Sequence, residues 1–235
     1  YAKWQAGTRF GESPTEQSVI DWVDEIDYSS SESASDNDKI LITYFSGTGN
    51  TRRVAQSILN HLSYGRIEEI KPVNPYTSSD LNYHDSNSRV VREHDDSSLR
   101  PEFNDINGID KAETVFVGYP LWWREAPHVV YTFIEKYSFS GKTIIPFCTS
   151  TSNGMGDSGK NLGAKTTGAT VYQGQRFKSD ANDDVKKWMD KIVQVDSNNR
   201  ITFLDKTIKV GLPTGAIIGI AVACVVVVAA IVIIK

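Results

Sequence analysis

The sequence predicts an α/β domain built on a doubly wound, five-stranded parallel sheet, with one transmembrane helix at its C-terminal side. Two observations predict the sheet: short apolar runs alternate with amphipathic helical segments, and the first run ends at a glycine-rich turn. A third observation predicts the membrane helix, since the twenty residues from Gly215 to Ile234 are apolar and carry no charge.

Five segments have the length and composition of strands. Each is short, rich in β-branched or aromatic residues and bounded by glycine, proline or polar residues. Apolar runs without alternation are typical of parallel strands that are buried on both faces. The five predicted strands are residues 39–45, 66–70, 114–117, 143–148 and 169–172.

Three segments between and after these strands have helical periodicity. In residues 50–62, Val54, Ile58 and Leu62 recur every four residues and fall on one helical face. Residues 128–136 and 183–193 show the same kind of apolar stripe. Strands and helices therefore alternate along residues 38–195, which we take as one domain.

Charge and cysteine content exclude several classes of function. The formal net charge is −4, and nucleic-acid binding requires a positive field, so we expect no nucleic-acid partner. The two cysteines, Cys148 and Cys224, are unsuited to a mutual disulfide because the second lies in the apolar tail. No cluster of residues has the spacing of metal ligands, so we expect no metal.

The turn after the first strand is the strongest candidate for a ligand site. Residues 46–51 read Ser-Gly-Thr-Gly-Asn-Thr and open the first helix. Glycines bring backbone N–H groups close to a ligand, and the helix N-terminus carries about half a positive charge. The turn contains no G-x-x-x-x-G-K-[ST] and no G-x-G-x-x-G motif, which argues against a nucleoside triphosphate or a dinucleotide. Its neutral donors suit a monophosphate.

Here the sequence resembles the flavodoxin family, whose phosphate loop follows the pattern Thr/Ser-x-Thr-Gly-x-Thr. Ser46, Thr48, Gly49 and Thr51 match that pattern. The resemblance implies strand order 2-1-3-4-5 and bound flavin mononucleotide (FMN). It covers about two-thirds of the chain and is closest to a bacterial-type subgroup, on residues 100–102 and 118–156.

The resemblance also implies where the flavin ring would lie. The loop after the third strand would cover the ring, and the loop after the fourth strand would contact its edge. Trp122 and Trp123, with Tyr119 nearby, supply aromatic faces for stacking, and we expect Trp122 to face the flavin. The resemblance assigns FMN contacts to Ser46, Gly47, Thr48, Gly49, Asn50, Thr51, Tyr119, Pro120, Leu121, Trp122, Trp123, Thr149, Ser150, Thr151, Ser152, Asn153 and Gly154.

No catalytic residue is predicted. His128 and Cys148 are reactive residue types, but their positions at a helix start and a strand end are more typical of structural roles. Residues 76–104 are polar and predict a loosely helical excursion beside the site, which we interpret as a surface loop or a partner-docking segment.

The segments outside the domain have distinct compositions. Residues 1–27 parallel part of the domain itself: Gly7-Thr8-Arg9-Phe10 corresponds to Gly174-Gln175-Arg176-Phe177, each followed by a Trp-containing helix. We interpret them as the tail end of a preceding flavodoxin-like repeat; the alternative is chance similarity of two amphipathic helices. Residues 28–37 predict a Ser-rich, acidic linker.

Residues 196–213 predict a juxtamembrane linker, and residues 214–234 a membrane-spanning helix of roughly 30 Å. Lys206 and Lys209 precede the span and only Lys235 follows it, which favours a tail anchor with the domain in the cytosol. A removed glycolipid-anchor signal is the alternative.

Three functions remain open at this point. The first is a membrane-tethered, FMN-binding electron-transfer module that serves redox partner proteins. The second is an FMN-dependent NAD(P)H quinone or flavin reductase, in which the excursion 76–104 shapes a substrate pocket. The third is a flavin-free interaction module of the same fold. The sequence contains no recognisable nicotinamide site, which ranks the first above the second.

Overall fold

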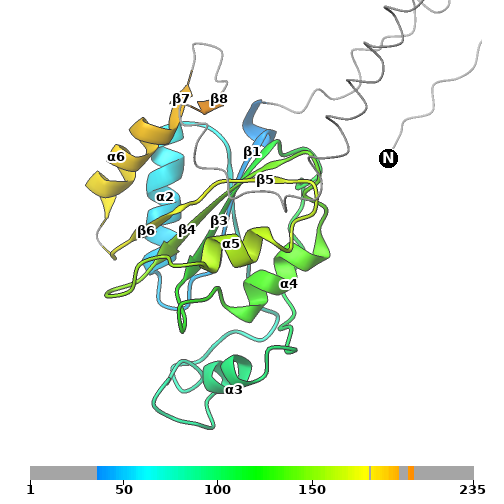
Figure 1. Ribbon diagram of the computed structural model, residues 1–235, viewed down its shortest axis with the longest axis vertical. Helices are drawn as coiled ribbons and strands as arrows, with labels where there is room; N and C mark the ends of the chain where they lie inside the picture. Colours follow the sequence, from blue (N-terminus) through cyan, green and yellow to red (C-terminus); the bar gives the residue numbers. More distant parts are fainter. Residues whose placement is uncertain (1–35, 180, 196–200, 204–235) are drawn as a thin grey trace, which may run out of the picture. The chain divides into compact units, whose positions relative to one another are not determined.

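The computed structural model describes residues 36–179, 181–195 and 201–203, all within one compact unit that begins at Asp36. A parallel sheet of order β2-β1-β3-β4-β5 has helices on both faces (Figure 1), which confirms the predicted doubly wound α/β fold and strand order. The elements are η2 (Asp36–Asp38), β1 (Ile40–Tyr44), α2 (Asn50–Leu62), β2 (Arg66–Glu69), α3 (Arg89–Asp95), β3 (Thr114–Pro120), α4 (His128–Lys136), β4 (Thr143–Thr149), α5 (Ser158–Gly163), β5 (Thr170–Val171), β6 (Gln175–Phe177), α6 (Asn182–Ile192), β7 (Val193–Val195) and β8 (Ile201–Phe203).

The sheet separates two apolar cores. Val115 and Val117 of β3 belong to the core under α4 and α5, whereas Phe116 belongs to the core under α2 and α6. This alternation follows from the strand geometry, in which successive side chains point to opposite faces. Figure 1 shows α2 and α6 on one side of the strands and α4 and α5 on the other.

The helices bury the faces that their periodicity predicts. Val54, Ile58 and Leu62 of α2 are 2% exposed or less. In α4 the buried residues are Val129, Val130, Phe133 and Ile134, and the helix begins directly after Pro127. Burying such side chains provides most of the stability that short helices lack in isolation.

The fifth strand differs from the prediction for residues 169–172. It is divided into β5 and β6, which both pair with β4. Three steps along β4, from Ile144 to Phe147, oppose four steps on the edge strand, so the edge strand bulges by one residue. Two features coincide with this break. Pro146 lies in β4 without an N–H, and a Cβ on Gly174 would lie 2.2 Å from the Pro146 carbonyl oxygen.

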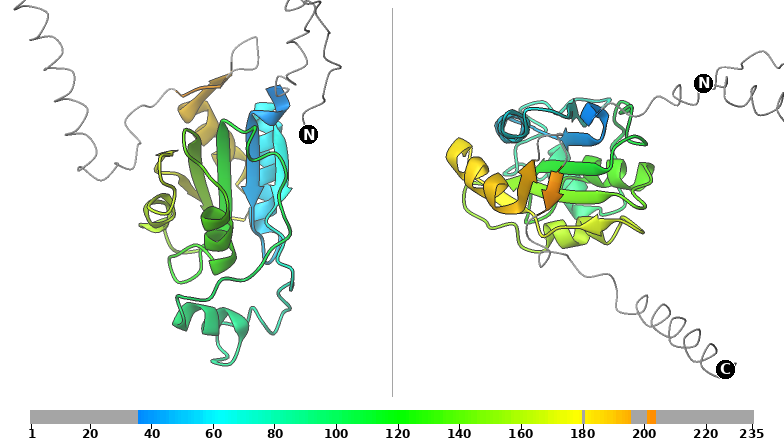
Figure 2. Two further views of the ribbon diagram at one scale, coloured as in Figure 1. Left: turned by 90° about the vertical axis from the view of Figure 1, so that its right-hand side faces the viewer. Right: turned by 90° about the horizontal axis from the view of Figure 1, so that it is seen from above.

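The excursion between β2 and β3 contains one short helix, α3, beyond the carboxyl ends of the strands (Figure 2). A buried ion pair holds it: Arg89 Nε lies 2.7 Å from Glu93 Oε1, and Glu93 is 5% exposed. The Tyr76 hydroxyl donates to Glu93 Oε2 at 2.7 Å, and the Arg89 guanidinium lies 3.9 Å from the centroid of the Tyr76 ring. These contacts join α3 to Tyr76, whose ring packs 5.4 Å from that of Phe45 and 5.5 Å from that of Trp122 and so anchors the excursion to the domain.

Two features at the C-terminal side were not predicted. Helix α5 covers the sheet between β4 and β5, and β7 pairs with β8 in an antiparallel ladder. β8 falls inside the segment 196–213 that we expected to be a linker. The predicted repeat 1–27, most of the linker 28–37 and the predicted span 214–234 lie outside the described residues. No helix within the described ranges has the length and apolar character needed to cross a membrane.

Candidate functional site

The glycine-rich turn joins the end of β1 to the start of α2, as expected for residues 46–51. Its bend depends on Gly49, whose φ of +87° lies in the left-handed region that favours glycine. The Gly49 N–H donates to Ser46 Oγ at 3.0 Å, which fixes the turn. α2 is thirteen residues long, so the partial positive charge of its N-terminus faces the turn.

A buried hydroxyl pair connects this turn to the loop after β4. Thr51 Oγ1 and Thr149 Oγ1 lie 2.8 Å apart, and Thr51 is 1% exposed. The two loops therefore have a fixed separation across the carboxyl end of the sheet. A cation also stands beside the turn, because Arg53 hydrogen-bonds Asn50 Oδ1 and the Ser179 carbonyl oxygen. Arg53 was not among the site residues predicted from the sequence.

The loop after β3 provides two tryptophans in different environments. Trp122 is partly buried, and its ring packs edge-on at 5.5 Å from the rings of both Phe45 and Tyr76. Trp123 is 39% exposed and stacks on His94 at 4.5 Å with an interplanar angle of 7°. Trp122 therefore packs into the domain, whereas Trp123 lies at the domain surface.

These loops surround one cavity of about 590 Å³ at the carboxyl ends of β1, β3 and β4. In parallel α/β sheets, ligands bind at this edge, where the chain switches direction across the sheet. Every predicted contact residue lines the cavity except Gly49, Tyr119 and Gly154. The lining residues are Ser46, Gly47, Thr48, Asn50, Thr51, Leu81, Tyr83, Pro120, Leu121, Trp122, Trp123, Thr149, Ser150, Thr151, Ser152, Asn153 and Ser179.

Tyr119 requires a correction. Its side chain is fully buried, and its hydroxyl lies 3.0 Å from Ser158 Oγ of α5, so the ring packs inside the core rather than beside the cavity. Burial also raises the pKa of the Tyr119 hydroxyl above its ordinary value. Tyr119 and Trp122 both pack with the core under α4 and α5, but only Trp122 reaches the cavity.

Three lining residues were missed by the sequence analysis. Leu81 and Tyr83 come from the excursion, and Ser179 follows β6. Leu81 also contacts the glycine-rich turn, since a Cβ placed on Gly47 would lie 3.4 Å from Leu81 Cδ2 and 3.6 Å from Trp122 Cζ2. The excursion therefore forms part of the cavity and is more than a surface loop.

The sequence model of a family described as flavodoxin matches residues 39–192. The chain belongs to the flavodoxin family. No curated protein matches it.

Several solved structures resemble the flavodoxin domain. Candidate flavoproteins from Bacteroides uniformis ATCC 8492 and Bacteroides eggerthii DSM 20697 are 36% and 35% identical to it, with TM-scores of 0.62 and 0.59. Each match covers 65% of this chain, and 98% and 96% of the respective structures. A flavoprotein from Lactobacillus acidophilus NCFM in complex with FMN is 18% identical, over 64% of this chain and 97% of that one, with a TM-score of 0.46.

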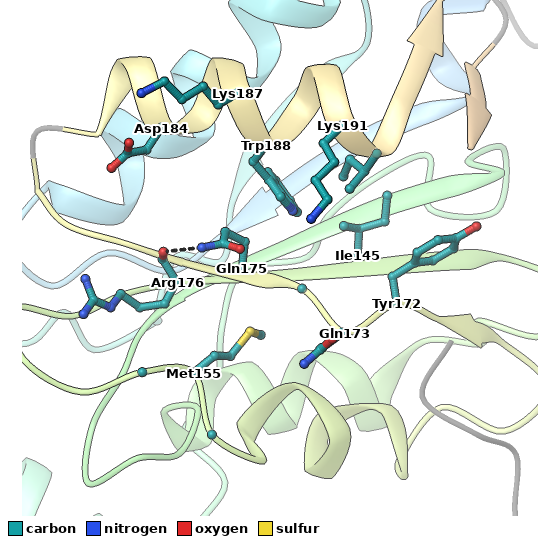
Figure 3. Close-up of a pocket in the computed structure, with 14 residues that line it drawn as sticks. Ile145, Met155, Tyr172, Gln173, Gln175, Arg176, Asp184, Lys187, Trp188 and Lys191 are labelled. Carbon is teal, nitrogen blue, oxygen red and sulfur yellow. Dashed lines mark hydrogen bonds between the residues drawn. The ribbon is translucent and has the colours of Figure 1, made fainter. Parts of the chain in front are cut away.

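The flavodoxin domain has a second hollow, of about 790 Å³, between α6 and the edge strand. Figure 3 shows Trp188 and Lys191 extending from the helix toward the segment that carries Gln173 and Gln175. Gly154 is the one predicted contact residue that lines this hollow. Although larger, it has neither a helix N-terminus nor the convergent loops, so the cavity at the strand ends is the better candidate.

The two reactive side chains set aside earlier are both constrained by burial. Cys148 is fully buried in β4, and burial raises the pKa of its thiol to about 12, which keeps the thiol protonated and unreactive. Burial lowers the pKa of His128, and its Nδ1 has no hydrogen-bond partner among the described residues. Neither side chain lines the cavity, and the described residues contain no cluster suited to a metal ion.

Proposed function

We propose that the flavodoxin domain binds FMN in the 590 Å³ cavity and transfers electrons between redox partner proteins. The observation that carries this proposal is the convergence of three loops, 46–51, 120–123 and 149–153, around one cavity at the carboxyl ends of the strands. The chain's membership of the flavodoxin family supports it.

The residues present suit both ends of FMN. The hydroxyls of Ser46, Thr48 and Thr51 and the backbone N–H groups at the start of α2 are donors for a phosphate, and Arg53 adds a nearby positive charge. At the other end, Trp122 offers an aromatic wall for a flat ring. Bound FMN would supply the electron-accepting and electron-donating chemistry, and the protein would orient it and limit its contact with water.

A second function is favoured by one observation. Leu81 and Tyr83 extend the cavity from the excursion, so the site is larger than the three loops alone would make it. An added wall suits an FMN-dependent NAD(P)H quinone or flavin reductase, which must hold a substrate beside the flavin. Electron transfer ranks first because the cavity has no recognisable nicotinamide motif.

The visible spectrum of the purified full chain tests the proposal. We expect a yellow protein with flavin absorption maxima and, after FMN is removed, recovery of those maxima when FMN is added back. A colourless protein that does not bind added FMN would contradict it and would favour a flavin-free interaction module. Steady oxidation of NADPH by the yellow protein alone would favour the reductase.

We also propose that the domain is tethered to a membrane through residues 214–234 and faces the cytosol. The uncharged twenty-residue stretch and the lysines before it support this proposal. The full chain should stay in the membrane fraction after carbonate extraction, and a variant that lacks residues 214–235 should be released. Release of both would contradict the tether.

A further inference from the structure

The tip of the loop after β3 carries unusual residues for its geometry. Trp122 and Glu125 exchange two backbone hydrogen bonds of 3.0 and 2.9 Å, which closes a two-residue hairpin. The two residues between them, Trp123 and Arg124, have φ values of +46° and +69°. Positive φ at both central positions is the mark of a type I′ turn, where Asn-Gly is favoured and bulky side chains are strained.

This strain is localised. Trp123 and Arg124 are two of only three non-glycine residues with positive φ among the described residues, the other being Ser63 at the end of α2. Strained backbone of this kind persists when its surroundings hold it in place, and it concentrates at functional sites.

The base of the turn is held from three directions. Glu125 accepts hydrogen bonds on both carboxylate oxygens, from the Tyr131 hydroxyl of α4 at 2.9 Å and from Asn161 Nδ2 of α5 at 2.6 Å. The Leu121 N–H donates to the Thr149 carbonyl oxygen of β4 at 2.9 Å. These contacts fix the strained tip, and each oxygen of the carboxylate next to Arg124 already accepts one hydrogen bond.

The tip therefore presents an aromatic face and a positive charge. Trp123 lines the cavity and is backed by His94 in a parallel stack. Arg124 is exposed next to the cavity without lining it, and its Nη2 lies 3.8 Å from where a Cβ on Gly156 would be. It has no ion pair with any residue in the described part of the chain. Tyr83, which is 66% exposed, contributes a further aromatic ring to the same cavity.

We propose that the Trp123–Arg124 turn is a binding site for a second, flat aromatic molecule that carries an acidic group. The indole and the Tyr83 ring provide surfaces for stacking, and the guanidinium pairs with a carboxylate, sulfonate or phosphate. The inference rests on the proposed function, since this molecule would meet FMN in the same cavity. It assigns the strained turn a role in selecting what approaches the flavin.

Binding of anthraquinone-2-sulfonate to the full-length, FMN-loaded protein tests the site, with uncharged 2-methylanthraquinone as the matched probe. Isothermal titration calorimetry should show that Arg124→Gln lowers the affinity for the sulfonate by about tenfold or more and leaves the affinity for the uncharged probe unchanged. Trp123→Leu should weaken the binding of both probes. Lys187→Gln, which removes an equal charge on α6 away from the cavity, should change neither.

The double variant W123N/R124G separates a binding role from a structural one. It installs the Asn-Gly pair that the turn geometry favours, so its Tm should be no lower than that of the wild type while the sulfonate no longer binds. The inference is overturned if the wild type does not bind the sulfonate, or if Arg124→Gln and the double variant bind it as tightly as the wild type does.

The FMN content of each variant distinguishes a failure of this inference from a failure of the proposed function. If the variants keep their FMN content and bind the sulfonate as the wild type does, this inference alone is wrong. A protein that contains no FMN would contradict the proposed function. Competition by NADPH then identifies the source of the ligand. If NADPH displaces the sulfonate, the natural ligand is a nicotinamide nucleotide. If NADPH does not displace it, the natural ligand is a small aromatic acid.

Discussion

The two ends of the cavity are constructed in different ways. At one end, residues 46–51 form a turn from six consecutive positions, fixed by Gly49 and by the Ser46 hydroxyl. At the other end, the walls come from the loop after β3, the loop after β4 and the excursion that carries Leu81 and Tyr83, of which Leu81 also contacts the glycine-rich turn. The first end is local and unstrained, whereas the second is assembled from distant segments and contains a strained turn.

This difference separates the tasks that the two ends can perform. A phosphate needs a fixed set of donors, and a short turn at a helix N-terminus provides them with little dependence on the rest of the fold. A ring and its reaction partner need walls whose spacing and exposure can be adjusted. We therefore expect substitutions at the ring end to change both stability and selectivity, and substitutions at the phosphate end to change mainly flavin affinity.

The largest effect should come from the ion pair that anchors the excursion at the ring end. Arg89→Met leaves the buried Glu93 carboxylate without its cation, which should lower the free energy of unfolding by about 3 kcal/mol in urea titrations. The double variant R89M/E93L removes both charges and should recover most of that loss. A single variant as stable as the wild type would show that the excursion is held by other contacts.

The next largest effect should be a difference between substitutions of the two tryptophans. Trp122→Ala removes a ring that packs on Phe45 and Tyr76, so we expect a loss of about 2 kcal/mol together with weaker FMN binding. Trp123→Ala should cost less than about 1 kcal/mol, because its ring is exposed and only stacks on His94. Thermal unfolding and flavin titration of both variants measure the difference, and equal losses would contradict the distinct environments.

At the phosphate end, glycine substitutions allow a matched comparison. Gly49→Ala and Gly141→Ala each place a Cβ at a positive φ, of +87° and +77°, and each should cost about 1 kcal/mol of stability. Only Gly49→Ala should also weaken FMN binding, by about tenfold, because Gly49 shapes the turn whose neighbouring residues line the cavity, whereas Gly141 lies in a loop that contributes no lining residue. Unchanged FMN affinity in both variants would show that the glycine-rich turn does not contribute to the FMN site.

The smallest effect should be the pH response of His128, which begins α4 outside the cavity. Burial, together with the positive charge of Arg100 and the nearby His94, lowers the pKa of His128, while Glu93 and the Leu99 backbone oppose that shift. The unfolded chain therefore binds the proton more tightly, and stability should decline as the pH falls below about 6.5. His128→Gln should flatten this decline in urea titrations at stepped pH. An identical decline would assign it to other groups.

Much of this architecture is encoded locally. The doubly wound parallel sheet, the glycine-rich turn and the buried faces of α2 and α4 follow from short-range periodicity and from the residues at 46–51, whereas the strand order was implied by the family resemblance. The positions of Thr149 to Asn153 could be anticipated, because the carboxyl ends of parallel strands meet at one edge of the sheet.

The missed features depend on tertiary contacts. Tyr119 and Trp122 are both aromatic residues near the end of β3, and only the packing of Tyr119 against Ser158 shows which of them enters the core. The break between β5 and β6 lies opposite Pro146 of the neighbouring strand β4, a contact between segments that are distant in the sequence. Leu81 and Tyr83 belong to a polar segment with no regular period, so no local pattern points to the cavity they line.

Titration of the flavin-depleted protein with FMN and with riboflavin, followed by quenching of flavin fluorescence, tests the central claim most directly. The two ligands share the ring and differ only in the phosphate, so their affinity ratio isolates the contribution of residues 46–51. We expect FMN to bind at least about a hundredfold more tightly, the equivalent of about 2.7 kcal/mol from two or more charge-assisted hydrogen bonds. Equal affinities would contradict a phosphate site on this turn, and no binding of either ligand would contradict the assignment of the cavity to a flavin.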